Sequence, residues 1–292
     1  MKNKNFKIDF LGVGTIRGGT TWVHECLKEH PQVCVPTPKE THFFNDSYKY
    51  QKGLTYYSSF FKSKKCKVRG EINPGYLNNP MIAEKIKKNF PNIKILIFLR
   101  NPIERAWSHF LKHKNKGCNQ IEKFEEILKK ENIYINTGFY YKNIKKYIEL
   151  FGKEKVLILI YEDLEKNPEK FIESIYSFIG VDKTFKPKVL SRKVNYLGYS
   201  NAYLPKLNKI LIRPSKLLPK KLLKLLKKSR LIEKIFLNIR KIMFRLNTSK
   251  NHPYNKKTEE IPSKLRKEMK EIYKEDIQNI EKLMKRNLNF WK

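Results

Sequence analysis

The stretch GTIRGGTT, residues 14–21, contains residue types that bind phosphate. An apolar run at residues 7–13 leads into it, and an amphipathic helix is expected at residues 20–29. A strand, a glycine loop and a helix in this order present backbone N–H groups and the positive end of a helix dipole to an anion. The glycines allow close approach of the backbone, the threonines add hydroxyl donors and the arginine adds charge. The residues expected to hold the anion are Arg17, Gly18, Gly19, Thr20 and Thr21.

This loop differs from the loop of nucleotide triphosphatases, GxxxxGK[ST], in which the lysine reaches the phosphates and the hydroxyl holds Mg²⁺. Gly14 and Gly19 have the expected separation, but Thr20 stands in place of the lysine. The buried strand expected at 93–99 ends in Arg100, where a magnesium-binding loop has its partner aspartate. The sequence therefore predicts phosphate binding without a metal ion, and it disfavours an ATPase or a kinase.

Arg100 provides a second place for an anion. It follows a strand, and open α/β sheets take their ligands at the carboxyl ends of the strands. Ser108 lies eight residues further on, about two turns into the next helix, and could add a hydroxyl to the same anion. Two separate phosphate sites predict a nucleotide that is phosphorylated on both sides of its ribose.

The elements around these residues alternate between strand and helix. Strands are expected at 7–13, 67–72, 93–100 and 155–164, and helices at 20–29, 54–62, 80–90, 102–113, 122–131, 140–151 and 167–180. This alternation is typical of an α/β protein with three layers and a mostly parallel sheet. We expect a P-loop-like single domain over residues 1–292, with about five central strands and helical additions at its C-terminal end.

The chain is strongly basic, with 63 Lys and Arg against 28 Asp and Glu and a formal net charge of +35. Such a surface attracts nucleic acid, anionic membranes, acidic polysaccharides and charged nucleotides. A coding bias explains the excess equally well, because only 11 of the basic residues are arginine. Residues 206–250 contain 15 basic residues and one acid, Glu233. This segment is expected to be a basic helical insertion or cap, or a contact surface for anionic lipid or polyanions.

The four cysteines, Cys26, Cys34, Cys66 and Cys118, show no CxxC pair and no metal-ligand spacing. They are expected to be free thiols in a reducing compartment. The N-terminal residues pass directly into the first expected strand, without a signal peptide or an apolar run long enough to cross a bilayer. The sequence therefore predicts a cytoplasmic protein.

Five segments in order resemble the sulfotransferase family, and in particular its bacterial carbohydrate and heparan sulfate enzymes. They are VGTIRGGTTWVHECLKEHPQV, PKETHFF, GEINPGYL, ILIFLRNPIERAWSHF and VLILIYEDLEKNPEKFIESIYSFIGV, which together span about residues 8–200. The resemblance implies transfer of a sulfuryl group from 3′-phosphoadenosine 5′-phosphosulfate (PAPS) without a metal. The other product is adenosine 3′,5′-bisphosphate (PAP). PAPS has a phosphate on each side of its ribose, as the two expected anion sites require.

The same resemblance implies roles for single residues. Residues 17–21 would hold the 5′-phosphosulfate, and Arg100 with Ser108 would hold the 3′-phosphate. The family usually has a lysine at position 17, where it stabilises the leaving phosphate. Arg17 brings the same charge as a planar fork.

Glu40 in KETHFF matches the general base of the glycosaminoglycan enzymes. An acceptor hydroxyl must lose its proton as it attacks sulfur, and a carboxylate within hydrogen-bond reach can take that proton. His42, two residues on, matches a second polar position and could orient Glu40 or the acceptor. The catalytic residues expected are therefore Glu40, Arg17 and His42.

The expected partner is a small-molecule or glycan acceptor, already anionic or not, with no specific nucleic acid. Three alternatives stay open at this point. The chain could be a nucleotide kinase with a degenerate loop, or a basic nucleic-acid or membrane-surface protein that binds through residues 206–250. It could also be a sulfotransferase fold that has lost its activity.

Overall fold

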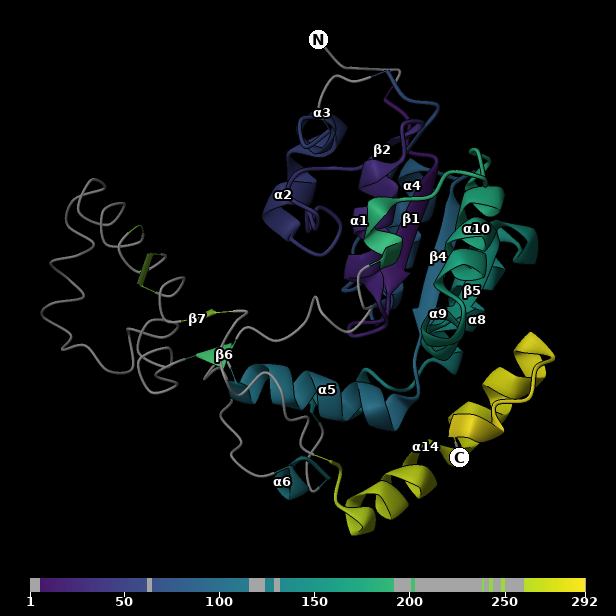
Figure 1. The fold of residues 1–292 in the computed structure, drawn as a ribbon. Helices are drawn as coiled ribbons and strands as arrows, with labels where there is room; N and C mark the ends of the chain where they lie inside the picture. The colour runs from purple at the N-terminus through teal and green to yellow at the C-terminus, as the bar shows by residue number, and fades with distance from the viewer. Residues whose placement is uncertain are drawn as a thin grey trace, which may run out of the picture. The chain divides into compact units, whose positions relative to one another are not determined.

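The structure is a computed structural model, and it describes residues 6–61, 65–115, 124–128, 132–191, 201–202, 238, 242–243, 248–249 and 260–291. The chain divides into two compact units. Figure 1 shows the order of the helices and strands along the chain. The first contains residues 1–106, 135–197 and 266–292, and the second contains residues 107–134 and 198–265. The single domain expected over 1–292 stays a prediction. The basic segment 206–250 lies almost entirely outside the described residues, so its role stays a prediction too.

The first unit contains a sheet of five strands in the order β2-β3-β1-β4-β5. All the neighbouring strands pair in parallel. The strands are β1 (Phe10–Gly14), β2 (Val33–Cys34), β3 (Val68–Ile72), β4 (Lys94–Leu99) and β5 (Val156–Ile160). The expected α/β architecture with a parallel sheet of about five strands is confirmed. β2 has only two residues, and the sequence pattern did not reveal it.

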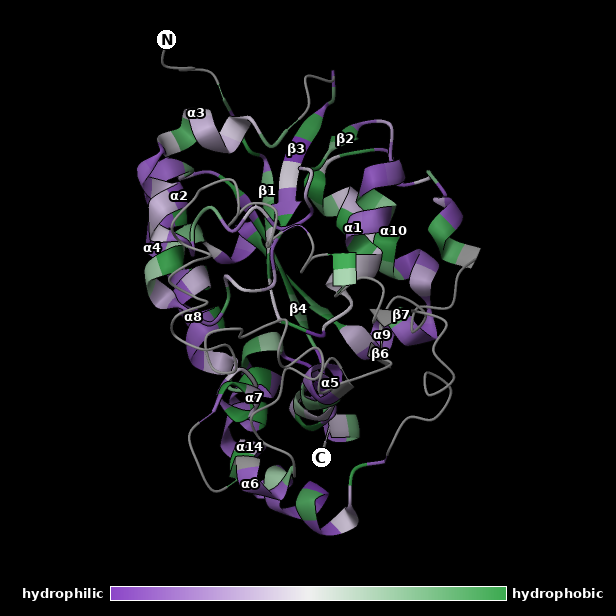
Figure 2. Ribbon diagram, turned by 90° about the vertical axis from the view of Figure 1, so that its left-hand side faces the viewer, coloured by the Kyte–Doolittle hydropathy of each residue, from purple (hydrophilic) through white to green (hydrophobic). Residues whose placement is uncertain are grey.

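Helices cover both faces of this sheet (Figure 2). One face carries α1 (Thr20–Glu29) and α10 (Pro168–Ile179), and the other carries α4 (Pro80–Asn89) and α8 (Tyr141–Phe151). β4 is apolar after Lys94 because both of its faces are covered. Leu96 and Phe98 join the hydrophobic core with α1 and α10, and the alternate residues Ile95 and Ile97 are also fully buried.

The expected strand at 155–164 is too long. β5 ends at Ile160, and α9 begins at Tyr161. Glu162 and Asp163 occupy the first turn of α9, where carboxylates interact favourably with the helix dipole. The other helices are α2 (Ser47–Gln51), α3 (Gly53–Ser58), α5 (Pro102–Asn115), α6 (Glu125–Leu128), α7 (Ile133–Asn136) and α14 (Ser263–Met284). A separate pair of short antiparallel strands is formed by β6 (Asn201–Ala202) and β7 (Thr248–Ser249).

The strand order places the functional loops. The chain leaves β1 for the β2 and β3 side of the sheet and later returns to β4, which pairs with β1 on the opposite side. Such a reversal opens a crevice at the carboxyl ends of the two central strands. Gly14, the last residue of β1, is aligned with Ile97 of β4. The loop after β1 and the residue after β4 therefore meet at this edge.

The expectation of four free cysteines is wrong. Cys34 and Cys66 form a disulfide, with their Cα atoms 5.9 Å apart. The parallel pairing of β2 with β3 aligns Cys34 with Arg69 and so brings the two cysteines together across 32 residues of sequence. Cys26 is a free, buried thiol, and burial raises its pKa, which makes it unreactive. Cys118 lies outside the described residues.

Candidate functional site

The loop that follows β1 has a backbone that only glycine permits at two positions. A Cβ on Gly18 would lie 2.8 Å from the carbonyl oxygen of Phe98, and one on Gly19 would lie 2.9 Å from Leu164 Cδ2. Gly19 has φ of 80°, in the left-handed region, and Arg17 has φ of 73° although it is not a glycine. A bent loop of this kind is seen where the surrounding structure fixes the backbone for a ligand.

The first turn of α1 suits an anion. Its N-cap is Gly19, which has no side chain to cap the helix, and its first turn contains no acidic residue. The N–H groups at this end are therefore not covered by a carboxylate of the same turn. Thr20 is buried and Thr21 is exposed, so the two hydroxyls lie at different depths. These features fit the 5′-phosphosulfate of PAPS, because a glycine cradle, hydroxyl donors and N–H groups all favour an anion.

Arg100 reaches the same loop from the end of β4. Its Nη1 donates to the backbone oxygen of Arg17 over 3.3 Å, and its guanidinium carbon lies 4.5 Å from the centre of the Tyr161 ring. Burial raises the pKa of Tyr161 to about 12, so the phenol stays neutral at physiological pH. A guanidinium on the face of a neutral aromatic ring is held by a cation–π interaction. The two arginines expected at separate anion sites thus lie beside one another.

The backbone around Arg100 is also fixed. Its carbonyl oxygen accepts a hydrogen bond of 2.9 Å from the hydroxyl of Tyr140. The N–H of Asn101 donates to Glu162 Oε1, also over 2.9 Å, and Asp163 pairs with Arg286 near the C-terminal end. Glu162 and Asp163 therefore have structural roles.

Ser108 lies on α5, and its side chain is buried, with 4% of the residue exposed. It belongs to the second of the two units, whereas Arg100 belongs to the first. Its expected role at the 3′-phosphate stays a prediction.

Glu40 and His42 lie together in the segment after β2. The Nε2 atom of His42 is 3.8 Å from Glu40 Oε2, and both side chains reach solvent. Lys39, whose role the sequence does not indicate, lies between Glu40 and the first turn of α1. Its Nζ is 3.0 Å from Glu40 Oε1 and 3.5 Å from Thr21 Oγ1. The expected base and the expected anion loop are thus linked through Lys39.

A buried carboxylate fixes the segment that carries Glu40. Glu71, at the end of β3, is fully buried and accepts hydrogen bonds from the N–H and the hydroxyl of Thr41, over 2.7 and 2.8 Å. It also accepts from the Tyr57 hydroxyl over 2.7 Å and from Asn73 Nδ2 over 3.2 Å. Burial raises the pKa of Glu71, and these donors oppose that rise. Thr41 lies between Glu40 and His42, so this network sets the position of both.

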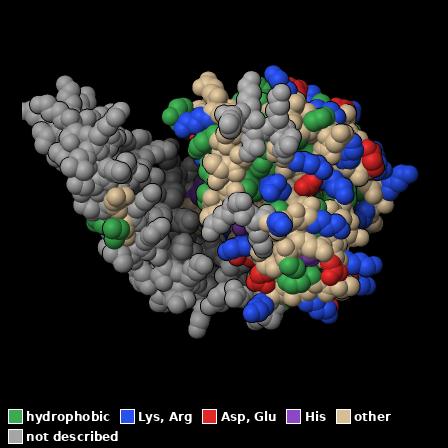
Figure 3. Space-filling view, turned by 90° about the horizontal axis from the view of Figure 1, so that it is seen from above, with side chains coloured by type: hydrophobic (Ala, Val, Ile, Leu, Met, Phe, Trp, Pro, Cys, Tyr) green, Lys and Arg blue, Asp and Glu red, His purple; other side chains and the backbone are tan. Residues whose placement is uncertain are grey.

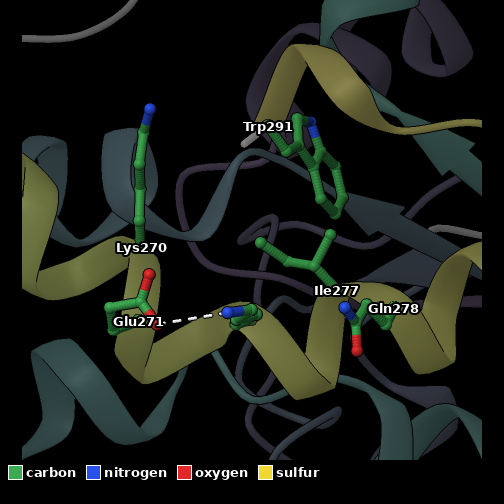
Figure 4. A pocket seen from close by; sticks show the side chains of 6 residues that line it. Lys270, Glu271, Ile277, Gln278 and Trp291 are labelled. Atoms are coloured by element: carbon green, nitrogen blue, oxygen red, sulfur yellow. Dashed lines mark hydrogen bonds and ion pairs between the residues drawn. The ribbon is translucent and has the colours of Figure 1, made fainter.

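The described part of the chain has many basic side chains on its surface. Lys and Arg side chains spread over the face shown in Figure 3, with fewer Asp and Glu between them. A separate pocket of about 210 Å³ lies along α14, with Trp291 at one side and an ion pair of 3.4 Å between Glu271 and Lys274 (Figure 4). None of the expected site residues lines it. In the described ranges, no cluster of His, Cys, Asp and Glu is arranged to hold a metal ion.

Several known proteins resemble this chain. Membrane-associated sulfotransferase kil1 of Dictyostelium discoideum is 32% identical over 169 residues, which cover 54% of this chain and 33% of that protein. Heparan sulfate glucosamine 3-O-sulfotransferase 5 of Mus musculus is 27% identical over 181 residues, covering 58% of this chain and 52% of that protein. The chain thus spans a third to a half of the length of these two relatives.

A crystal structure of a sulfotransferase from Alicyclobacillus acidocaldarius has the same fold. It aligns with a TM-score of 0.68 over 98% of this chain and 99% of its own, at 21% sequence identity.

These relatives contradict the expectation of a cytoplasmic protein, since kil1 is described as membrane-associated. The Cys34–Cys66 disulfide likewise argues against a reducing compartment. Within the part of the chain that the structure describes, no helix is both long and apolar enough to span a bilayer.

The kinase and nucleic-acid alternatives find no support among these relatives. The family model of the sulfotransferase domain matches residues 7–213 of this sequence, which include the loop after β1, Glu40 and Arg100. The chain belongs to the sulfotransferase family.

Proposed function

We propose that this chain transfers a sulfuryl group from PAPS to a hydroxyl, or to an amine, of a carbohydrate. The observation that carries the proposal is the approach of Arg100 to the loop that contains Arg17. Two arginines at the carboxyl edge of a parallel sheet, beside a helix that begins with glycine and threonine, suit a nucleotide with two phosphates.

The donor, when bound, supplies the sulfuryl group. Gly18, Gly19, Thr20 and Thr21 would hold its 5′-phosphosulfate, and Arg100 would hold its 3′-phosphate. Arg17 would stabilise the negative charge that develops on the leaving phosphate. These residues would keep the reacting groups in line, and positioning of this kind accounts for much of the rate in related transfers.

Glu40 would act as the general base. As a bond forms between the acceptor oxygen and sulfur, the bond between sulfur and the leaving phosphate oxygen breaks. The proton of the acceptor hydroxyl passes to Glu40. His42, 3.8 Å from Glu40, would orient the carboxylate or the acceptor.

A glycan is the favoured acceptor class, because one of the similar proteins, heparan sulfate glucosamine 3-O-sulfotransferase 5, is named for a glycan. The net charge of +35 also suits an acceptor that is already anionic. The segment 206–250 would provide any contact with an anionic membrane, as its 15 basic residues suggest.

The test is incorporation of label from ³⁵S-PAPS into heparan sulfate, an uncharged glycan and a small phenol, with γ-labelled ATP as the competing donor. The proposal expects labelled glycan and free PAP, in equal amounts, and no transfer from ATP. Label that passes only from ATP, or from PAPS to none of the acceptors, would contradict it.

A further inference from the structure

Lys39 occupies an unusual place for a lysine. Its side chain is only 18% exposed, and its ammonium lies within hydrogen-bond distance of two groups from different elements. One is Thr21 in the first turn of α1, and the other is Glu40 in the segment after β2. Lysine side chains usually extend into water, and restricting one removes conformational freedom. The ammonium of Lys39 therefore has a defined position between the anion loop (residues 17–21) and the carboxylate of Glu40.

The positively charged side chains of the site lie at two different ends of the loop formed by residues 17–21. The guanidinium carbon of Arg100 lies 4.5 Å from the centre of the Tyr161 ring. Both Arg100 and Arg17 lower the pKa of that phenol against the larger effect of burial. Arg100 also contacts the backbone of Arg17. Lys39 is instead joined to Thr21 and to Glu40. The arginines thus serve the end of the loop near Tyr161, and Lys39 serves the end that faces the carboxylate.

We propose that Lys39 binds the oxygens of the sulfuryl group itself. The inference rests on the proposed function, in which the sulfuryl group moves from the anion loop toward an acceptor oxygen beside Glu40. An ammonium between Thr21 and Glu40 lies on that path. It carries three N–H donors, and two acceptors contact it among the described residues. The third donor can meet a sulfuryl oxygen.

The transfer step is favoured by a positive charge beside the sulfuryl oxygens. Sulfur gains a bond to the acceptor oxygen as it loses the bond to phosphate, and the sulfuryl oxygens remain negatively charged throughout. Lys39 neither gains nor loses a proton, and it stabilises this charge by attraction and hydrogen bonding. Arg17 stands where the family usually has a lysine, and Lys39 supplies the compact, adaptable ammonium that a guanidinium does not.

A different role for Lys39 would be to hold Glu40 in position only. The two roles predict different effects of Lys39 on the affinity for PAPS relative to PAP. A residue that binds the sulfuryl group favours PAPS over PAP, because PAP lacks that group. A residue that only positions Glu40 leaves the relative affinity for PAPS and PAP unchanged.

The experiment measures the dissociation constants of PAPS and PAP by calorimetry without acceptor, for the wild type, Lys39→Met and Lys39→Arg. Lys28→Met is the matched control, because it removes one positive charge from a lysine on α1 whose side chain is 60% exposed. Melting temperatures establish that each variant is folded.

We expect Lys39→Met to weaken PAPS binding by about ten- to a hundredfold, as the loss of a hydrogen bond between charged groups does. PAP binding should change less than about threefold. Lys39→Arg should retain part of the preference for PAPS, and Lys28→Met should leave the ratio unchanged. Equal weakening of both nucleotides in a folded Lys39→Met protein, or no weakening of either, would overturn the inference. If the wild type binds neither nucleotide, the donor assignment itself fails.

Discussion

Arg100 and Arg17, 83 residues apart in sequence, meet where Arg100 Nη1 donates to the backbone oxygen of Arg17 over 3.3 Å. The parallel pairing of β1 with β4 produces this contact, because each residue follows the carboxyl end of one of the two strands. Tyr161 is the residue that follows β5. The centre of its ring lies 4.5 Å from the guanidinium carbon of Arg100 and so supports that guanidinium. The contact joins the two expected anion sites into a single arrangement.

Substitution of Glu40 by glutamine should abolish the base and leave the nucleotide site intact. We expect the turnover number to fall about 10²- to 10⁴-fold, because a neutral amide cannot accept the acceptor's proton. PAP affinity should stay within about twofold. The measurement is single-turnover transfer of ³⁵S to heparan sulfate, with calorimetry of PAP. Glu25→Gln, at a partly exposed position of α1, is the control. Full activity in Glu40→Gln would remove this residue from the mechanism.

Tyr57→Phe should destabilise the buried network around Glu71. The variant loses the 2.7 Å hydrogen bond from the Tyr57 hydroxyl to Glu71 Oε2. We expect the free energy of unfolding in urea to fall by about 1–3 kcal/mol, since a fully buried carboxylate loses one of its donors. Tyr56→Phe, at the neighbouring and less buried position, should change it by less than about 0.5 kcal/mol. Equal effects of the two variants would mean that the Glu71 hydrogen bond is unimportant.

His24 should make the protein sensitive to acid. It is 4% exposed, and burial, with smaller effects of Lys39 and Lys28, lowers its pKa from 6.5 to about 4. The neutral form is favoured in the folded state. Its stabilisation is therefore complete above pH 6.5 and is lost as the pH falls toward 4.

His24→Leu should remove this dependence. Between pH 7 and pH 4, the variant should lose about 3 kcal/mol less of its free energy of unfolding than the wild type. Urea unfolding at pH 7, 5.5 and 4 measures the difference. Parallel pH profiles of the two proteins would show that His24 does not contribute.

The disulfide should stabilise the edge of the sheet. Cys34→Ser combined with Cys66→Ser should reduce the free energy of unfolding by about 3–4 kcal/mol, because the disulfide closes a chain segment of 32 residues. Reductant should lower the melting temperature of the wild type and not that of the double variant. A wild type that is indifferent to reductant would contradict the pairing.

The sequence predicted the parts of the structure that depend on strong local signals. The apolar run of β4 requires cover on both faces, and this alone indicates a buried parallel strand that is followed by Arg100. The glycine loop before α1 is likewise visible in the residue types. β2 was not predicted because two residues give no periodicity. The strand expected at 155–164 was too long because Tyr161 and Leu164 are apolar in a helix as they would be in a strand.

The parts of the site that depend on tertiary contacts were harder to predict from the sequence. Lys39 is one of 63 basic residues, and nothing in the neighbouring sequence indicates that its ammonium lies between Thr21 and Glu40. The Cys34–Cys66 pairing arises from the alignment of β2 with β3, which no spacing rule encodes. The network around Glu71 combines residues from three separate segments, so its burial appears only in the folded chain.

Arg100 and the loop of Arg17 are proposed to form one site for a nucleotide with two phosphates. Calorimetry can test this with PAP and Mg²⁺-ATP on the wild type, Arg100→Ala and Arg266→Ala. Arg266, which pairs with the partly exposed Glu104, is the control for charge. We expect PAP to bind more tightly than ATP, and Arg100→Ala alone to weaken PAP binding by about ten- to a hundredfold. Preference for ATP, or a PAP affinity that does not respond to Arg100→Ala, would contradict it.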